Sequence, residues 1–598
     1  MTRIESGSIF FKFSPVLAVA VALLAAVPAA AAPPAGAPAL RPRGTTKQLV
    51  VDGRPFLMLG GELGNSTASS AASLDAAWPR LQALHLNTVL SPVYWELIEP
   101  VEGKLDFSSV DRVITGARQR GLHVVLLWFG SWKNSMSSYA PAWVKRDVQR
   151  FPRVEVKGGR KVEMGTLGGF PCPPAKDCAG EPSSLHAIEI LSPFGEAGLA
   201  ADARVFAALM RHLRQFDGAR HTVLLVQVEN EVAMVEDAAD RSAVAQRARA
   251  QAVPKELVDA LVARRAQAAP PLAASVAPSP GAVHLWAAAG ARTSGTWSQL
   301  FGEGDTTDEI FMAWSFARYV DAVTRAGKAE YALPMYVNAA LNRPGARPGQ
   351  YNSGGPLPHL YEVWRAGAPS IDFQAPDIYM PNFVDWIGRY ARADNPLFVP
   401  EAKNDLSCAV KAFYAIGAHQ AMGFSPFAIE SLEPAVASAL GDGYRVLSQL
   451  TPLILAHQGL GSMTGVLLDK DNPSADVKLG DYRIHLAHDF TWEWSGPGRL
   501  APNWPIAGAV IINSGPREYT IAGNGIIATF APDPPIAGVS GIERIEEGTF
   551  QNGKWVPGRR MNGDENHQGR HLRLAVGSFG IQKVWLYRAE VAPKPAGN

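Results

Sequence analysis

Eight short aliphatic runs, separated by stretches with helical periodicity, dominate the sequence between residues 48 and 459. The runs cover residues 56–64, 87–95, 123–130, 222–231, 333–341, 371–380, 396–405 and 423–431. Each run is nearly continuous in apolar residues, as in strands covered on both faces, and amphipathic stretches such as 196–216 lie between them. Strands that alternate with helices form a parallel sheet, and eight of them close a barrel. We therefore expect an α/β fold with a (β/α)8 TIM barrel over residues 48–459.

An open, doubly wound sheet would show the same alternation of strands and helices. Such a sheet usually carries a G-x-G-x-x-G phosphate loop after its first strand. The sequence "FLMLGGELGNS" at residues 56–66 does not match that pattern, so the barrel is the better interpretation.

The character of the chain changes at about residue 460. Runs such as "AGAVIINSG" at 507–515 and "GIIATFAP" at 525–532 are typical of strands, and Asn552–Gly553 is a hairpin-turn signal. We expect residues 460–598 to form a smaller, all-β, sandwich-like C-terminal domain.

The N-terminus has the parts of a secretory signal. Arg3 and Lys12 carry positive charge, residues 14–27 form a short apolar core, and small residues follow up to Ala32. We expect residues 1–31 to be a signal peptide, residues 32–47 a flexible leader, and the mature protein to be exported to the periplasm or the extracellular space. Retention of the signal as an anchor is the alternative. No later run of about 18 apolar residues predicts a membrane span after signal removal.

Three cysteines fit an oxidising compartment. Cys172 and Cys178 lie six residues apart in a Pro-rich loop, where a disulfide would hold an otherwise loose excursion. Cys408 is left over, and we interpret it as a buried small apolar residue.

Polar or aromatic residues stand at the end of nearly every aliphatic run. They include Glu62, Asn65, Trp95, Trp132, Lys133, Asn134, Asn230, Glu231, Asn338, Tyr379, Glu401 and Glu430. In an eight-stranded barrel the carboxyl ends of the strands converge on one face, where active sites are built. This face is therefore the expected site.

Two carboxylates at this face suit glycoside hydrolysis. A retaining glycosidase needs two carboxyl groups about 5 Å apart, one as general acid and one as nucleophile, and Glu231 and Glu401 end the fourth and seventh runs. The Asn230 amide would bind a sugar hydroxyl beside the reacting carbon. The alternatives are that Glu231 is a helix-start carboxylate and that Glu401 pairs with Lys403.

The motifs around these residues resemble glycoside hydrolase family 35, the β-galactosidases of clan A. "VQVENEV" at 226–232 looks like the acid/base motif of that family, and residues 84–107 and 121–144 are similar to its second and third strands. The resemblance covers residues 48–430. It implies Glu231 as acid/base, Glu401 as nucleophile, retention of configuration, and no metal or organic cofactor. The all-β tail resembles the extra domain of a bacterial branch of the family.

The sugar contacts of the family are altered in this chain. Asn65 and Pro92 stand where the family commonly has tyrosines, and "GSWKNS" at 130–135 replaces its Cys-Ala-Glu segment. We expect Trp132, Lys133 and Asn134 to provide different donors and a stacking wall, although Lys133 could equally be a solvated loop charge.

Four further residues complete the predicted substrate site. Tyr379 is expected to hold Glu401 ionised by a hydrogen bond, with a packed barrel tyrosine as the alternative. Glu62, Trp95 and Glu430 are also predicted substrate contacts.

The predicted function is a retaining exo-β-galactosidase acting on side chains of plant polysaccharide such as xyloglucan or arabinogalactan. The formal net charge of +1 gives no broad field for nucleic acid or an anionic membrane, so the expected partner is a carbohydrate. Another clan A β-glycosidase or endo-glycanase, and a non-catalytic carbohydrate-binding barrel, are the alternatives. The sequence carries no signal for the oligomeric state.

Overall fold

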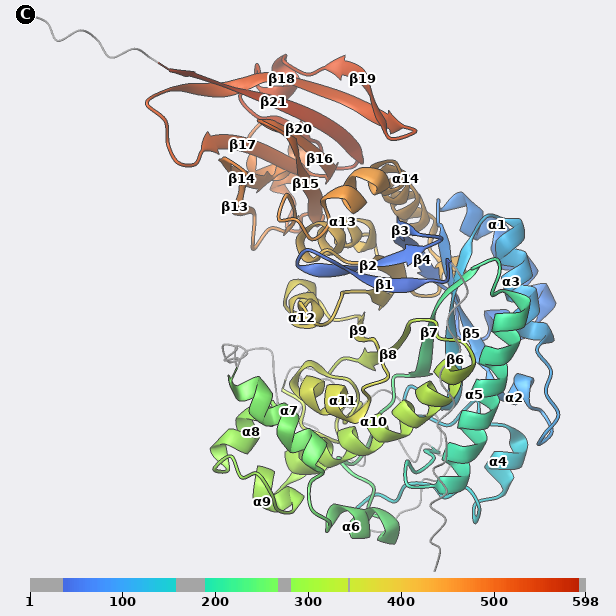
Figure 1. The fold of residues 1–598 in the computed structure, drawn as a ribbon. Helices are drawn as coiled ribbons and strands as arrows, with labels where there is room; N and C mark the ends of the chain where they lie inside the picture. Colours follow the sequence, from blue (N-terminus) through green and yellow to red (C-terminus); the bar gives the residue numbers. More distant parts are fainter. Residues whose placement is uncertain (1–35, 158–188, 267–280, 343–344, 591–598) are drawn as a thin grey trace, which may run out of the picture.

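A closed barrel of eight parallel strands forms the larger part of the molecule (Figure 1). The computed structural model describes residues 36–157, 189–266, 281–342 and 345–590. The predicted signal peptide and the predicted Cys172–Cys178 disulfide lie outside these residues. The predicted fold class is confirmed, because each aliphatic run contributes one strand of the barrel and antiparallel sheets follow it.

The barrel strands are joined in the order β10-β11-β4-β5-β6-β7-β8-β9, and every pairing is parallel. Their bounds are Met58–Glu62 (β4), Thr88–Tyr94 (β5), His123–Lys133 (β6), Val223–Asn230 (β7), Met335–Ala340 (β8), Phe373–Ile378 (β9), Val399–Ala402 (β10) and Gly423–Pro426 (β11). Nearly all of their residues are buried, because the interior is filled by side chains and helices cover the outside.

The helices form the outer ring and the long connections. They are Ala71–Ala83 (α1), Trp95–Ile98 (α2), Ser108–Gln119 (α3), Ala142–Arg146 (α4), Glu196–Phe216 (α5), Ala243–Arg249 (α6), Lys255–Ala266 (α7), Ala282–Ala288 (α8), Trp297–Phe301 (α9), Asp305–Glu330 (α10), Tyr361–Gly367 (α11), Phe383–Tyr390 (α12), Cys408–His419 (α13) and Pro434–His457 (α14). Four of them lie in the described residues between β7 and α10. Cys408 is buried at the start of α13, as expected.

Residues 39–47, predicted as part of a flexible leader, are ordered instead. They belong to a small antiparallel sheet of β1 (Ala39–Arg43), β2 (Thr46–Val51) and β3 (Arg54–Phe56). The Thr45 amide donates to the carbonyl of Gly459, and Asp52 in the β2–β3 turn pairs with His221 before β7. Backbone pairing outweighs the Pro and Gly content of this segment and fixes it to the amino-terminal end of the barrel.

Two antiparallel sheets follow α14. The larger has the order β12-β15-β16-β21-β18-β19 and the smaller β13-β14-β17-β20. Their bounds are Met463–Leu468 (β12), Ser474–Leu479 (β13), Tyr482–His488 (β14), Ala507–Gly515 (β15), Glu518–Asn524 (β16), Ile526–Pro532 (β17), Gly538–Gln551 (β18), Lys554–Arg560 (β19), Leu572–Leu574 (β20) and Gly580–Glu590 (β21). One apolar core lies between the two sheets, as in a sandwich.

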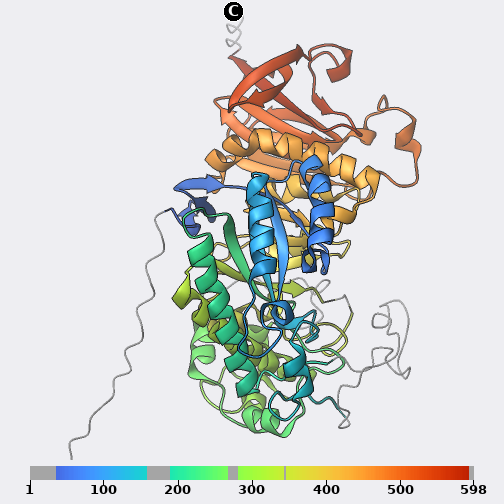
Figure 2. The same cartoon turned by 90° about the vertical axis from the view of Figure 1, so that its right-hand side faces the viewer.

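The outer face of the larger sheet packs on the barrel. Met463, Val510 and Ile512 belong to the same buried cluster as the barrel residues, and β12 and β15 contact α13. The two antiparallel sheets, β12 to β21, are therefore stacked against one side of the barrel, and α13 and α14 lie between the sheets and the barrel, as Figure 2 shows. Within the described residues, no helix is both long enough and apolar enough to span a membrane.

Candidate active site

The end of β7 turns sharply and presents Asn230 and Glu231 at the carboxyl face of the barrel. Glu229 and Glu231 have φ angles of 61° and 47°, in the left-handed region that non-glycine residues rarely adopt. The backbone amide of Glu231 donates to Asn338 Oδ1 on β8 at 2.9 Å, which holds the turn. Strain of this kind concentrates at functional sites, where the surrounding structure maintains it.

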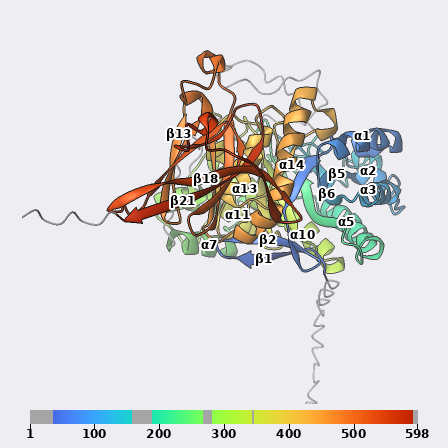
Figure 3. The same cartoon turned by 90° about the horizontal axis from the view of Figure 1, so that it is seen from above.

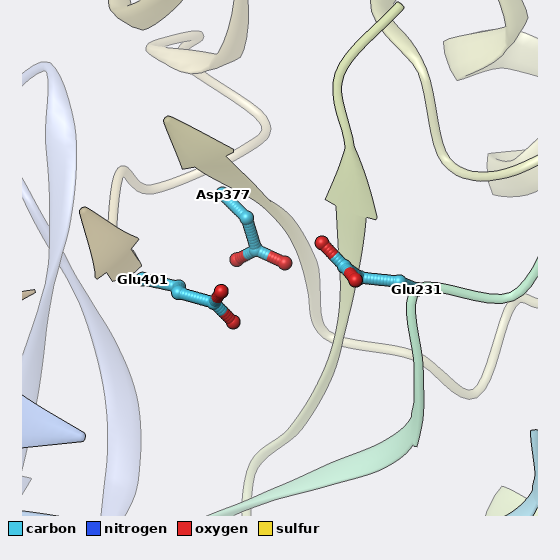
Figure 4. A group of neighbouring side chains, drawn as sticks. All are labelled: Glu231, Asp377 and Glu401. Carbon is cyan, nitrogen blue, oxygen red and sulfur yellow. The ribbon is translucent and has the colours of Figure 1, made fainter. Parts of the chain in front are cut away.

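Glu231 meets two more carboxylates, Asp377 on β9 and Glu401 on β10 (Figure 4). Asp377 and Glu401 are direct partners in the β9–β10 pairing. One carboxylate oxygen from each of the three residues lies within 4.8 Å of the other two. The side chains are buried, and Glu231 and Glu401 are only 5% and 4% exposed.

Neutral and positive neighbours hold this trio in place. Asn338 Nδ2 donates to Asp377 Oδ2 at 2.6 Å, so Asn338 joins Asp377 to the Glu231 backbone. Lys133 Nζ at the end of β6 lies 3.9 Å from Glu231 Oε2. The Tyr379 hydroxyl donates to Glu401 Oε1. The predicted Tyr379–Glu401 contact is therefore present, and Lys133 is buried among the carboxylates rather than solvated.

Burial raises the pKa of Glu401 to about 7, and the Glu231 carboxylate acts in the same direction. Lys133 and the Tyr379 hydroxyl act against this shift because they stabilise the ionised form. Burial acts to lower the pKa of Lys133, but Glu231, Glu401, Glu62 and Asp377 outweigh it and hold that pKa above its usual value. A protonated lysine thus stands beside the carboxylates at neutral pH.

Two further carboxyl groups at the site hold protons more tightly than usual. Burial raises the pKa of Asp377, and the charges of Glu401 and Glu231 add to the shift. The pKa of Glu62 at the end of β4 is also raised. Burial is the largest cause, and the charge of Glu401 is the second. Like charges this close cannot all be ionised, so the cluster retains protons at neutral pH. It can therefore supply a general acid and a nucleophile together.

Buried polar atoms without partners are concentrated around this cluster. Both amide atoms of Asn230 lack a hydrogen-bond partner among the described residues, as do Glu62 Oε1, Asp377 Oδ1 and Glu401 Oε2. Buried polar groups are rarely left unpaired, so each needs an explanation. A ligand rich in hydroxyl groups would satisfy donors and acceptors of both kinds.

Two predicted sugar contacts are wrong, because their indole rings are packed in the core. Trp95 starts α2, is fully buried, and donates its indole N–H to Glu99 one turn later. Trp132 is also fully buried; it donates to the carbonyl of Leu191 and packs edge-on against Tyr319. Adjacent residues of a strand point to opposite faces, and in β6 it is Lys133 that points to the site.

The remaining predicted contacts lie at the rim. Asn134 is exposed and accepts a hydrogen bond from Asn352 at 2.7 Å. Glu430 accepts from the Gly64 amide and the Thr67 hydroxyl, so it ties two loops together. Asn65 Oδ1 is buried and has no partner among the described residues, which keeps it available to a ligand.

A second carboxylate pair lies on the outer face of the barrel wall. Glu229 Oε2 accepts from the Trp132 amide at 2.8 Å, and Asp202 of α5 accepts from Trp128 Nε1 at 2.9 Å and from Ser131 Oγ at 2.7 Å. Burial raises the pKa of Glu229 well above its usual range, and Asp202 adds to the shift. This pair fixes the bulged end of β6 that carries Lys133.

Asp377 and the bridging role of Asn338 are the parts of the site that sequence reasoning missed. Asp377 stands within the apolar run 371–380, two residues before Tyr379. The signal that could have found it is a carboxylate inside a buried strand, where burial of a charge is costly.

Within the described part of the chain, Glu231, Asp377 and Glu401 are the group of acidic, His and Cys side chains close enough to share a cation. Lys133 already places a positive charge beside them. The arrangement therefore suits acid–base and nucleophilic chemistry by the side chains themselves, and the prediction of a metal-free site stays a prediction.

Comparison with known proteins gives matches to parts of the chain. A family model described as a domain of unknown function, DUF5597, matches residues 440–573. A curated β-galactosidase of Xanthomonas manihotis is 38% identical over 109 residues, which are 18% of this chain and 18% of that protein.

The chain is also similar to solved β-galactosidases. That of Bacillus circulans sp. alkalophilus has a TM-score of 0.42 at 13% identity, and that of Rahnella sp. R3 has 0.41 at 17%. Each match covers 67% of this chain and 57% of the solved chain. The chain thus spans under a fifth of the curated relative and little more than half of these solved chains. The barrel itself rests on the strand pairing described above.

Proposed function

We propose that the protein is a retaining exo-β-galactosidase of glycoside hydrolase family 35. The observation that carries the proposal is the approach of the Glu231 and Glu401 carboxylate oxygens to within 4.8 Å at the carboxyl face of the barrel. Retaining glycosidases place their two carboxyl groups about 5 Å apart, whereas inverting enzymes leave about 6.5–9.5 Å for a water. The separation therefore favours double displacement. The match to the Xanthomonas manihotis β-galactosidase supports the sugar.

In the first step Glu401 attacks the anomeric carbon while Glu231 protonates the leaving oxygen. The C–O bond to the leaving group breaks as the bond to Glu401 forms, giving a glycosyl-enzyme ester. In the second step the ionised Glu231 takes a proton from water, which releases the sugar and restores both groups. Tyr379 and Lys133 keep Glu401 available as a nucleophile, because both favour its ionised form.

Asn230 and Asp377 have separate roles in this proposal. The unpartnered Asn230 amide binds the hydroxyl next to the anomeric carbon, where the bond strengthens as positive charge develops. Asp377 is hydrogen-bonded to Asn338, which also accepts from the Glu231 amide. We assign Asp377 as a positioning residue that holds the acid/base at its distance from Glu401.

The substrate class follows from the resemblance and the predicted export signal. We propose terminal β-galactosyl residues of xyloglucan or arabinogalactan side chains, met in the periplasm or outside the cell. The altered contacts, Asn65, Pro92 and Lys133, favour a second candidate within the same chemistry. That candidate is a clan A glycosidase for another β-linked sugar.

The test is hydrolysis of aryl β-galactoside beside the β-glucoside, β-mannoside and α-L-arabinoside, with the anomer of the first-formed product read by NMR. Cleavage of the galactoside with a β product is expected. Cleavage of another glycoside with retention would support double displacement but show that the sugar is not galactose. An α product from a β-linked substrate would contradict double displacement, and inactivity on every glycoside and on both polymers would leave only a binding protein.

A further inference from the structure

One tryptophan of the chain is exposed. All fifteen tryptophans lie in the described residues, and fourteen are buried or half-buried, whereas Trp494 has 62% of its surface exposed. An indole buries a large apolar area when it finds a partner, and Trp494 is exposed beside other aromatic rings rather than alone, so its surface suits a contact site. Trp494 lies in the segment 489–506, which joins β14 to β15.

Aromatic rings back this indole. Trp492 lies 5.6 Å from Trp494 between ring centroids, His567 lies 5.6 Å from Trp494, and His571 lies 5.0 Å from Trp492. We call these four residues the aromatic platform. Burial, together with the charges of His567 and Arg573, lowers the pKa of His571 to about 4, so its ring is neutral at neutral pH.

The segment that carries the platform is held in one conformation. Asp489 accepts from Arg573 Nε at 2.7 Å, from the Val576 amide at 3.1 Å and from Ser495 Oγ at 3.1 Å. The Arg573 guanidinium in turn lies over the Trp492 ring at 4.7 Å. A surface fixed before binding loses little conformational entropy when a ligand arrives.

The platform lies on the catalytic side of the molecule. Figures 2 and 3 show the orange segment between β14 and β15 projecting toward the side to which the barrel strands run, rather than toward the amino-terminal end of the barrel. A glycan whose terminal sugar is bound in the barrel mouth would extend out of the site on this side.

We propose that the aromatic platform binds the part of a glycan chain that lies beyond the galactosyl residue being removed. This rests on the proposed function and names its substrate class as a polymer or long oligosaccharide. Trp494 would stack on the apolar C–H face of a pyranose, with Trp492 and His567 fixing its plane. Asp489 compensates the Arg573 charge, and the exposed Arg570 contacts His567 Nε2 at 2.7 Å at the edge of the platform. The platform therefore offers stacked rings with one cation at its edge, and the rings suit the apolar face of a sugar.

The test separates binding from catalysis. In affinity electrophoresis through galactosylated xyloglucan and through arabinogalactan, the Glu401→Gln protein should be retarded by at least one polymer. The further change Trp494→Ala should weaken that retardation about 3- to 10-fold, as expected for loss of one aromatic stacking contact. Trp494→Phe should restore part of it. Leu500→Ala is the matched control, because Leu500 lies in the same segment and is 77% exposed but carries no ring.

Kinetics give the second readout. In the otherwise unchanged enzyme, Trp494→Ala should raise KM for the polymer by a similar factor and leave kcat/KM for aryl β-galactoside unchanged. Equal retardation of the Glu401→Gln protein with and without Trp494→Ala would overturn the proposal. The surface would then suit a protein partner. Absence of aryl galactoside hydrolysis in the parent would count against the proposed function alone, because the electrophoresis needs no turnover.

Discussion

Glu229 and Glu231 stand two residues apart at the end of β7, yet their carboxyl groups belong to opposite kinds of cluster. Glu229 meets Asp202 outside the barrel wall, where amide, indole and hydroxyl donors reach each carboxylate oxygen except Glu229 Oε1. Glu231 meets Asp377 and Glu401 at the barrel mouth, where a lysine approaches and several oxygens have no partner among the described residues. Both clusters are buried.

The difference shows which properties set the Glu231 cluster apart from a buried structural pair. Burial and a raised pKa occur in both clusters, so neither property identifies chemistry by itself. The Glu231 cluster is distinguished by the positive charge beside it, by several unpartnered donors and acceptors rather than one, and by an opening at Tyr379, which is 41% exposed. In the other cluster Asp202 and Glu229 Oε2 have donors, one oxygen, Glu229 Oε1, has none among the described residues, and both side chains are fully buried.

Amide substitutions give the sharpest contrast between the clusters. Glu401→Gln should lower kcat/KM for aryl β-galactoside by at least about 10,000-fold, because the nucleophile is lost. Glu231→Gln should lower it by about 100- to 10,000-fold, because the proton donor is lost but an aryl leaving group still departs. Glu229→Gln should keep activity within about threefold, because a protonated acid and an amide have the same shape. Comparable losses in all three variants would show that the comparison is false.

Removal of the outer carboxylate should affect stability more than chemistry. Asp202→Ala leaves the Trp128 indole and the Ser131 hydroxyl without their acceptor, which should lower the free energy of unfolding by about 2–4 kcal/mol. Urea denaturation at pH 7 measures this, with Glu229→Gln as the control expected to lose less than about 1 kcal/mol. Equal stability of Asp202→Ala and the parent would contradict the structural role.

Lys133→Met should move the pH profile of the inner cluster. Lys133 favours the ionised form of Glu401, so its removal raises the pKa of Glu401 above about 7. The nucleophile then becomes protonated at a higher pH, and the acid limb of kcat/KM should move upward by about one pH unit. An acid limb that stays at the same pH, or moves to a lower pH, would show that Lys133 does not favour the ionised form of Glu401.

Glu401→Gln should also change how stability depends on pH. Burial raises the pKa of Glu401 to about 7 in the folded protein, above its ordinary 4.5. The contribution of the Glu401 carboxyl to the free energy of unfolding is complete below about pH 4.5, and it is lost as the pH rises through 7 and the buried group must ionise. Glutamine does not ionise, so the Tm of Glu401→Gln relative to the parent should be a few degrees higher at pH 8 than at pH 5. The reverse order would contradict the raised pKa.

The fold and the meeting of Glu231 with Glu401 could be predicted because local pattern determines them. Eight buried runs specify the barrel, and the position of Glu231 and Glu401 at strand ends brings them to one face. The neighbours depend on register and side-chain direction instead. Asp377 reaches the site because it pairs with Glu401 across β9 and β10, and sequence spacing does not contain that pairing.

Trp132 and the leader illustrate the same limit. Trp132 and Lys133 are adjacent, so one of them must face the barrel wall, and the bulge in β6 decides which. Residues 39–47 read as a Pro- and Gly-rich leader, but the backbone pairs of β1 and β2 order them. In both cases a tertiary contact outweighs the local signal.

Azide rescue tests the central assignment most directly. With aryl β-galactoside and azide, Glu401→Ala should regain turnover and release the α-galactosyl azide, because azide then attacks from the side of the missing nucleophile. Glu231→Ala should release the β-galactosyl azide, because azide replaces water on the intact Glu401 ester. Exchange of the two products, or rescue of neither variant on a substrate that the parent cleaves, would contradict Glu401 as nucleophile and Glu231 as acid/base.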